Sequence, residues 1–119
     1  MEKISMASDE IWQWLRTTTA DWPGVEEGTS FDHPCFRVGK SPFAVLDHYN
    51  EQDCLYLKIQ PERRAALLAA PGWFPAPYDP HERGLCRVLA DFDPAEVEPL
   101  VLESYRLAAP GRIRKEWKD

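Results

Sequence analysis

Three basic residues, Arg37, Lys40 and Lys58, have the side-chain types and the spacing to hold an anion. Arg37 and Lys40 lie three residues apart, across the end of an expected strand and the turn after it, and Lys58 lies on the mixed face of a later strand. A guanidinium fork and an ammonium group together suit a phosphate or a carboxylate. The structural alternative is that Arg37 pairs with Asp32 or Asp47 and that Lys58 is merely solvated, since surface ion pairs are common and weak.

A second group of candidates lies in the later half of the chain. Arg83 follows a proline-rich segment with the aromatic residues Trp73, Phe74 and Tyr78, and Arg106 begins a tail with more basic than acidic side chains. Aromatic rings beside arginines can stack nucleic-acid bases. The same rings can instead cover a sheet edge, and the basic tail can serve solubility alone.

Tyr105 and His33 have both a functional and a structural interpretation. Tyr105 is a second stacking candidate if its phenol lies at the sheet edge, or a core residue with a satisfied hydroxyl. His33 precedes Pro34, which favours extended backbone, and it titrates near neutral pH. A histidine in this setting more often fixes a turn through a backbone carbonyl, so we expect no catalytic role.

Metal and catalytic signatures are missing from the sequence. The cysteines, Cys35, Cys54 and Cys86, are odd in number and too widely spaced for a zinc site. Cys54 and Cys86 lie in apolar runs, where a thiol acts as a small hydrophobic group. No phosphate-binding loop, HExxH, GxSxG or GxGxxG string occurs. We therefore expect a binding protein with no cofactor, no metal and no enzymatic activity.

Length and composition predict one globular domain over residues 1–119, with residues 109–119 as a mobile tail. The chain has 119 residues, of which 44% are hydrophobic and 29% charged, and a formal net charge of −6. That charge opposes binding to phosphate backbones unless the basic groups cluster. There is no apolar run for a membrane helix and no signal peptide, so we expect a reducing cytoplasm and no membrane partner.

The spacing of apolar residues predicts the elements that must position these candidates. A helix over residues 8–20 follows from the cap at Ser8 and the apolar spacing after it. Strands are expected just before residue 33 and over residues 35–38, 42–49, 53–60 and 84–92, with turns between them. Residues 73–83 are expected to form an edge or a lip because of their prolines.

Two further helices complete the predicted fold. Pro61 suits the first position of a helix over residues 61–70. Asp93 and Pro94 resemble a helix start, but Pro99 indicates that the main helix begins near Glu98, after a separate turn. The fold class is therefore α+β, with an antiparallel meander, helices packed on one face and the other face free.

Four segments in family order resemble the MmcQ/YjbR family. Residues 33–44 (HPCFRVGKSPFA) resemble its HPxFRVxxKxFA core, and residues 57–62 (LKIQPE) resemble its strand-to-helix segment. Residues 75–78 (PAPY) and 103–107 (ESYRL) resemble its Pro-Ala loop and its C-terminal helix. The resemblance implies a compact α+β fold of the YjbR type, similar to frataxin-like and secretion-chaperone-like architectures, and DNA binding.

Three functions remain open from the sequence. The resemblance and the basic residues favour a DNA-binding protein. The acidic balance and the aromatic segment favour a protein-interaction module of the chaperone-like kind. A pocket near Arg37 and Lys58 would instead favour binding of a small anionic ligand. The sequence does not determine the oligomeric state.

Overall fold

The computed structural model describes residues 8–49, 51–77, 79 and 81–116 of the chain. In chain order, the elements are α1 (Ser8–Thr19), β1 (Val25–Ser30), β2 (His33–Val38), β3 (Ser41–Tyr49), β4 (Gln52–Lys58), α2 (Pro61–Leu68), β5 (Trp73–Pro75), β6 (Gly84–Val88), α3 (Pro94–Ala108) and α4 (Gly111–Glu116). This order confirms the predicted α+β class.

Within the described residues, six strands form one sheet in the order β1-β2-β3-β4-β6-β5, and every neighbouring pair is antiparallel. The first four strands form the predicted meander. The segment that contains Trp73 supplies β5 at the edge of the sheet, as its prolines predicted. β1 begins at Val25, earlier than expected. Each of its residues pairs with one on β2, so this pairing, and not local composition, determines where the strand begins.

Helix α1 ends near the residue that the sequence indicates, and it includes Ser8, which was expected to cap it. Asp9 and Glu10 lie in its first turn, where acidic groups favour the positive end of a helix. Ile11 and Leu15, one turn apart, are buried. The hydroxyl of Thr19 donates to the carbonyl of Leu15 at 2.8 Å in the last turn. This face holds α1 against the sheet.

Helix α3 corrects the expectation of a late start. Asp93 caps it by accepting the N–H of Ala95 at 3.1 Å, with Pro94 in the first turn. The helix then continues through Pro99 to Ala108 without a separate turn. Burial of Val97 and Val101 on either side of Pro99 stabilises the continuous helix against the loss of one backbone hydrogen bond.

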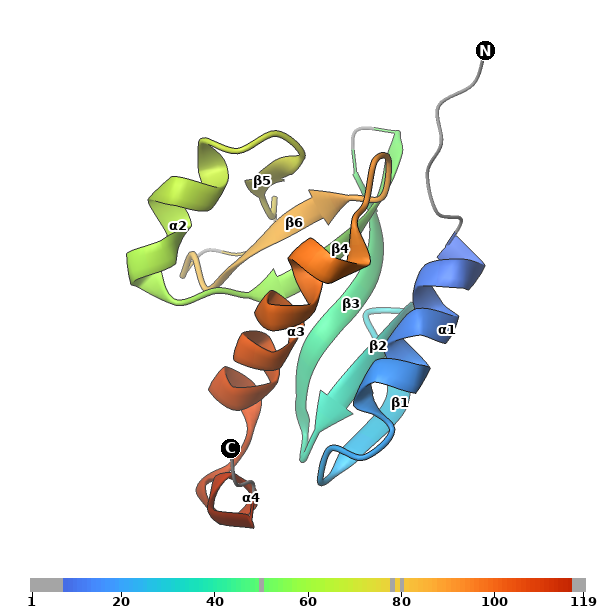
Figure 1. Cartoon of the computed structure of the whole chain (residues 1–119), viewed down its shortest axis with the longest axis vertical. Coiled ribbons are helices and arrows are strands. Elements are labelled where there is room, and N and C mark those ends of the chain that lie inside the picture. The colour runs from blue at the N-terminus through green and yellow to red at the C-terminus, as the bar shows by residue number, and fades with distance from the viewer. Residues whose placement is uncertain (1–7, 50, 78, 80, 117–119) are drawn as a thin grey trace.

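Helices α1 and α3 lie on the same face of the sheet (Figure 1). Aromatic contacts tie them to it: the ring centroids of Trp12 and Phe36 are 4.4 Å apart, and those of Phe43 and Tyr105 are 5.5 Å apart. The main apolar core therefore lies between these helices and the sheet. The opposite face is available for a site, as predicted.

The segment after α3 begins the tail that was expected to be mobile; its mobility stays a prediction, and residues 117–119 lie outside the described residues. Residues 111–116 form the short helix α4. Ile113 is buried, and a Cβ added at Gly24 would lie 2.5 Å from its side chain. This contact gives the beginning of the tail a defined place beside the turn after α1. None of the described helices is long and apolar enough to cross a membrane.

Candidate ligand pocket on the open face of the sheet

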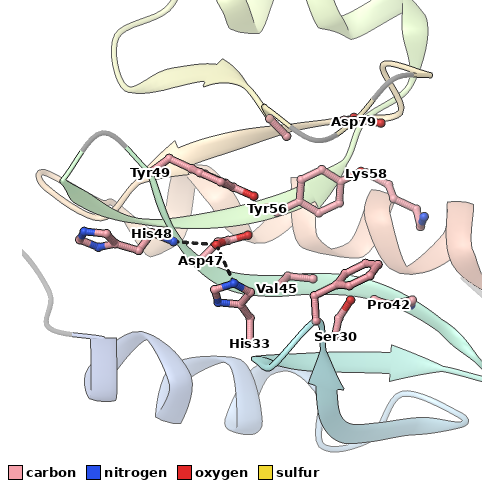
Figure 2. A pocket seen from close by; sticks show the side chains of 12 residues that line it. Ser30, His33, Pro42, Val45, Asp47, His48, Tyr49, Tyr56, Lys58 and Asp79 are labelled. Atoms are coloured by element: carbon pink, nitrogen blue, oxygen red, sulfur yellow. Dashed lines mark hydrogen bonds and ion pairs between the residues drawn. The ribbon is translucent and has the colours of Figure 1, made fainter.

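A pocket of about 760 Å³ lies on the face of the sheet that α1 and α3 leave open (Figure 2). Its size falls within the range of small-molecule sites. It is lined by Ser30, Phe31, His33, Pro42, Val45, Asp47, His48, Tyr49, Tyr56, Lys58, Ala76 and Asp79. Strands β2, β3 and β4 provide its floor, and Ala76 and Asp79, from between β5 and β6, lie at one side.

Strand alternation explains how the central side chains reach this face. Val45 on β3 is the register partner of Tyr56 on β4, so their side chains lie next to each other on one face. Asp47 and Lys58 lie two residues further along β3 and β4, so they share that face. Leu55 and Leu57 alternate with them and are buried in the core on the helix side.

One end of the pocket is a hydrogen-bonded group around Asp47. Its Oδ1 accepts the backbone N–H of His48 at 2.8 Å and lies 3.4 Å from Nε2 of His33. A hydrogen bond also joins Tyr49 to Asp47, and burial together with this bond raises the pKa of Tyr49. His33 therefore faces a carboxylate, which differs from the backbone-carbonyl contact that the sequence favoured.

The other end of the pocket holds the ammonium of Lys58 and the carboxylate of Asp79. Burial, followed by the nearby Arg83 guanidinium, lowers the pKa of Lys58, and Asp79 partly opposes this effect. Burial, followed by the Asp79 charge, raises the pKa of Tyr56 to about 12, so its phenol is neutral and able to donate. Asp79 accepts the N–H of Gly84 at 2.8 Å. Figure 2 shows the Lys58 ammonium at the far side of the pocket from His33 and Asp47.

Arg37 lies on the same face beside this end. A Cβ added at Gly28 would lie 2.7 Å from its guanidinium, so the side chain extends across the bare backbone of β1. Arg37 is the register partner of Pro42, which lines the pocket. Among the described residues, no carboxylate oxygen lies within 4 Å of Arg37. The alternative pairing with Asp47 is therefore wrong, because Asp47 faces His33.

The remaining candidates do not join this group. Lys40 is exposed in the β2–β3 turn and does not line the pocket. Arg106 belongs to the last turn of α3, on the opposite face of the sheet. Tyr105 is wrong as a stacking candidate, because it is 1% exposed and its hydroxyl donates to the carbonyl of Pro23 at 2.6 Å. Tyr78 lies outside the described residues.

The three cysteines are free and buried. Cys54 and Cys86 lie on the neighbouring strands β4 and β6, and a hydrogen bond between their thiols, followed by burial, raises the pKa of Cys86. Their role as small apolar groups agrees with the prediction. In the part of the chain that the structure describes, no three His, Cys, Asp or Glu side chains are placed to hold a metal ion.

Sequence reasoning missed several residues of the pocket, chiefly Phe31, Asp47, Tyr49 and Asp79. Asp47 and Tyr49 lie two and four residues after Val45, so the three residues share one face of β3. Pairing this face with the mixed face of β4 would have predicted their place in the pocket. Asp79 gives no such signal, because it lies between strands. Phe31 lies in a turn, where no strand or helix periodicity indicates which way its side chain faces.

The comparisons with known proteins concern the whole fold. The family model described as YjbR matches residues 20–107. A crystal structure of a Pseudomonas syringae protein is similar with a TM-score of 0.67 and 20% identity, over 87% of this chain and 99% of that one. A Deinococcus radiodurans protein, described as carrying the domain DUF419, is similar with a TM-score of 0.72 and 24% identity, over 88% of this chain and 86% of that one.

Among curated proteins, no sequence matches this chain. The two structural similarities support the fold alone. The family model covers most of the chain, including β1 to β6 and almost all of α3. The chain therefore belongs to the YjbR family.

Proposed function

We propose that this protein binds a small anionic ligand in the pocket on the open face of its sheet, without transforming it chemically. Lys58 carries the proposal, supported by Arg83 and by the neighbouring Arg37. An anion in the pocket would contact the Lys58 ammonium, while Arg83 acts on Lys58 electrostatically and Arg37 lies outside the lining on β2. This arrangement suits a carboxylate or phosphate group.

The observation that carries the proposal is the position of Lys58 in the pocket with no carboxylate in ion-pair contact among the described residues. The side chain is partly buried in the pocket, and burial and Arg83 both lower its pKa, so the protonated form is held at a cost. Among the described residues, no carboxylate oxygen lies within 4 Å of its ammonium. Asp79 opposes the lowering of the pKa from a distance, and a bound anion would supply a counter-charge in direct contact.

The contacts of Asp47 suit a structural role at one end of the pocket. Its side chain is 11% exposed and contacts His33, the N–H of His48 and the hydroxyl of Tyr49. Each of these contacts restrains the orientation of the carboxylate. We interpret this group as the structural support for one end of the pocket.

DNA binding, which the family resemblance implied, is less well supported. The formal net charge is −6, and two basic candidates, Lys40 and Arg106, lie away from the pocket. A duplex needs a continuous basic surface, since phosphate contacts supply most of the affinity. Among the described residues that line the pocket, Lys58 is the one lysine or arginine, which suits a single anionic group better than a polymer.

A protein-interaction module is also less well supported. The exposed large apolar side chains of the described residues are Phe31, Leu68 and Leu107, which belong to a turn, to α2 and to α3. Residues this scattered do not make the contiguous apolar patch that marks a protein partner. A cytoplasmic location remains part of the proposal and rests on the sequence alone.

The test is calorimetric titration of the full chain with 2-naphthoate and with its neutral carboxamide. We expect the acid to bind and the amide to bind about tenfold more weakly or not at all, since the charge-assisted contact is lost. Lys58→Met should weaken binding of the acid to a similar extent. Arg112→Met, which removes an exposed charge on α4, should leave this binding unchanged. Equal binding of acid and amide, or an unaffected Lys58→Met variant, would overturn the proposal.

A fluorescently labelled DNA duplex provides the competing arm of this experiment. We expect no change in anisotropy at micromolar protein, even in low salt. Tight binding that weakens steeply with salt would favour DNA as the partner.

Lys58→Met is expected to fold, because it removes a cation whose burial is unfavourable and keeps the unbranched stem.

A further inference from the structure

The turn between β1 and β2 holds an aromatic side chain in the solvent. Ser30 and His33 are register partners, so Phe31 and Asp32 form a two-residue hairpin turn, with φ values of 51° and 69°. Turns of this kind favour Asn-Gly, and a bulky residue with positive φ is unusual. Phe31 is 94% exposed. Neither the turn nor the core therefore explains a phenylalanine at this position.

The position of Phe31 at the pocket supplies an explanation. Its side chain lines the pocket together with the apolar side chains of Pro42, Val45 and Ala76. The ring of Tyr56 lies on the floor, as the register partner of Val45 (Figure 2). An occupant of the pocket would thus meet an aromatic ring on the floor and another at the entrance.

Sheet geometry gives the length of this apolar middle. Asp47 is the register partner of Cys54, and Lys58 lies four residues further along β4. At about 3.3 Å per residue, the two backbone positions are about 13 Å apart. The space left between the two polar ends fits one or two rings. Lys58 supplies a cation at one end, where Asp79 acts on it electrostatically, and the hydrogen-bonded Asp47 lies at the other.

We infer that the occupant is a planar aromatic acid, with its anionic group at Lys58 and its ring system between Tyr56 and Phe31. This inference rests on the proposed function and adds the chemical class of the ligand. A flat ring gains stacked or edge-to-face contacts with both aromatic side chains. A saturated acid of the same size makes the ionic contact but not these ring contacts.

The test compares 2-naphthoate with its saturated decalin carboxylate by calorimetric titration, with amide chemical-shift mapping on the full chain. We expect the aromatic acid to bind about 3- to 10-fold more tightly, as one or two ring contacts would give. Phe31→Ala should weaken 2-naphthoate by about 3- to 10-fold and leave the saturated acid unchanged. Amide shifts should appear at Val45, Tyr56 and Lys58.

The matched control is Leu68→Ala, which removes another exposed apolar side chain, on α2 and outside the pocket. It should change neither affinity. If both acids bind equally and both depend on Lys58, the class of ligand is wrong and the proposed function stands. If neither acid binds better than the carboxamide, the proposed function falls as well. Unaltered 2-naphthoate affinity in Phe31→Ala would also overturn the inference.

Discussion

Ser104 on α3 accepts the backbone N–H of Lys58 at 2.8 Å, and its hydroxyl donates in turn to the carbonyl of Phe43. A buried side chain on the helix face therefore fixes the backbone of the residue that supplies the cation to the pocket on the other face. The last residue of β4 is held from behind, and its side chain extends into the pocket. The position of the cation depends on α3 although α3 does not touch the pocket.

Ser104→Ala is expected to lower the free energy of unfolding by about 1–3 kcal/mol, because the change leaves two buried backbone groups without a partner. Urea unfolding measures this loss. Ser8→Ala, which removes a surface hydrogen bond to Asp53, is the control and should cost about 0.5 kcal/mol or less. A loss as small as that of the control would show that the Ser104 contacts do not stabilise the fold.

Gly84→Ala is expected to destabilise the protein strongly. A Cβ at Gly84 would lie 2.2 Å from the carbonyl oxygen of Leu57 and 2.7 Å from the hydroxyl of Tyr56. The first contact is with backbone, which cannot rotate away, so we expect a loss of about 2 kcal/mol or more. Thermal unfolding measures it.

Gly111→Ala provides the control for this change, since nothing lies within 4 Å of a Cβ there. Its melting temperature should equal or slightly exceed that of the wild type, because alanine is the better helix former. Similar losses in the two variants would contradict the packing described for Gly84.

Acid is expected to remove a small part of the stability through Asp53. Hydrogen bonds from His48 at 2.8 Å and from Ser8 at 3.0 Å lower the pKa of Asp53. A carboxylate with a lowered folded-state pKa stabilises the fold above its unfolded pKa of about 3.9, and the contribution is lost as pH falls through the folded value. Since both side chains of the ion pair are more than half exposed, water screens it to about 0.2–1 kcal/mol.

Asp53→Asn isolates this contribution. The variant should be slightly less stable than the wild type at pH 6, and the difference should shrink as the pH falls below 4. Urea unfolding at several pH values measures both quantities. A difference that stays constant down to pH 2.5 would mean that ionisation of Asp53 does not contribute.

Phe31→Asn is expected to separate stability from binding. Asparagine adopts the left-handed conformation of the turn more readily than phenylalanine, and the exposed ring contributes nothing to the core. We expect the free energy of unfolding to rise by up to about 1 kcal/mol. Affinity for 2-naphthoate should fall at the same time. A variant that is less stable than the wild type and binds 2-naphthoate equally tightly would contradict the role assigned to Phe31.

Local patterns predicted the elements better than their ends. The apolar spacing of α1 and the alternation of Leu55 and Leu57 in β4 depend on neighbouring residues, and the structure agrees with both. The extension of β1 to Val25 and the continuity of α3 through Pro99 depend on pairing and burial. These contacts are distant in sequence, so local patterns do not report them.

The site was predictable only in part for the same reason. Alternation on β4 indicated that Lys58 shares a face with Tyr56, and the position of Arg37 on that face followed from its strand. The contact between His33 and Asp47 requires the register of β2 on β3, which shifts between Phe36 and Arg37. The sequence alone cannot reveal such an irregularity.

The most direct test of the central claim is the pKa of the Lys58 ammonium, measured by NMR in the free protein and with saturating 2-naphthoate. In the free protein it should lie below the ordinary value of 10.5, owing to burial and then to Arg83. The bound anion should raise it, and affinity should therefore fall as the pH rises through the free-state value. A pKa that saturating 2-naphthoate leaves unchanged would contradict an anion site at Lys58.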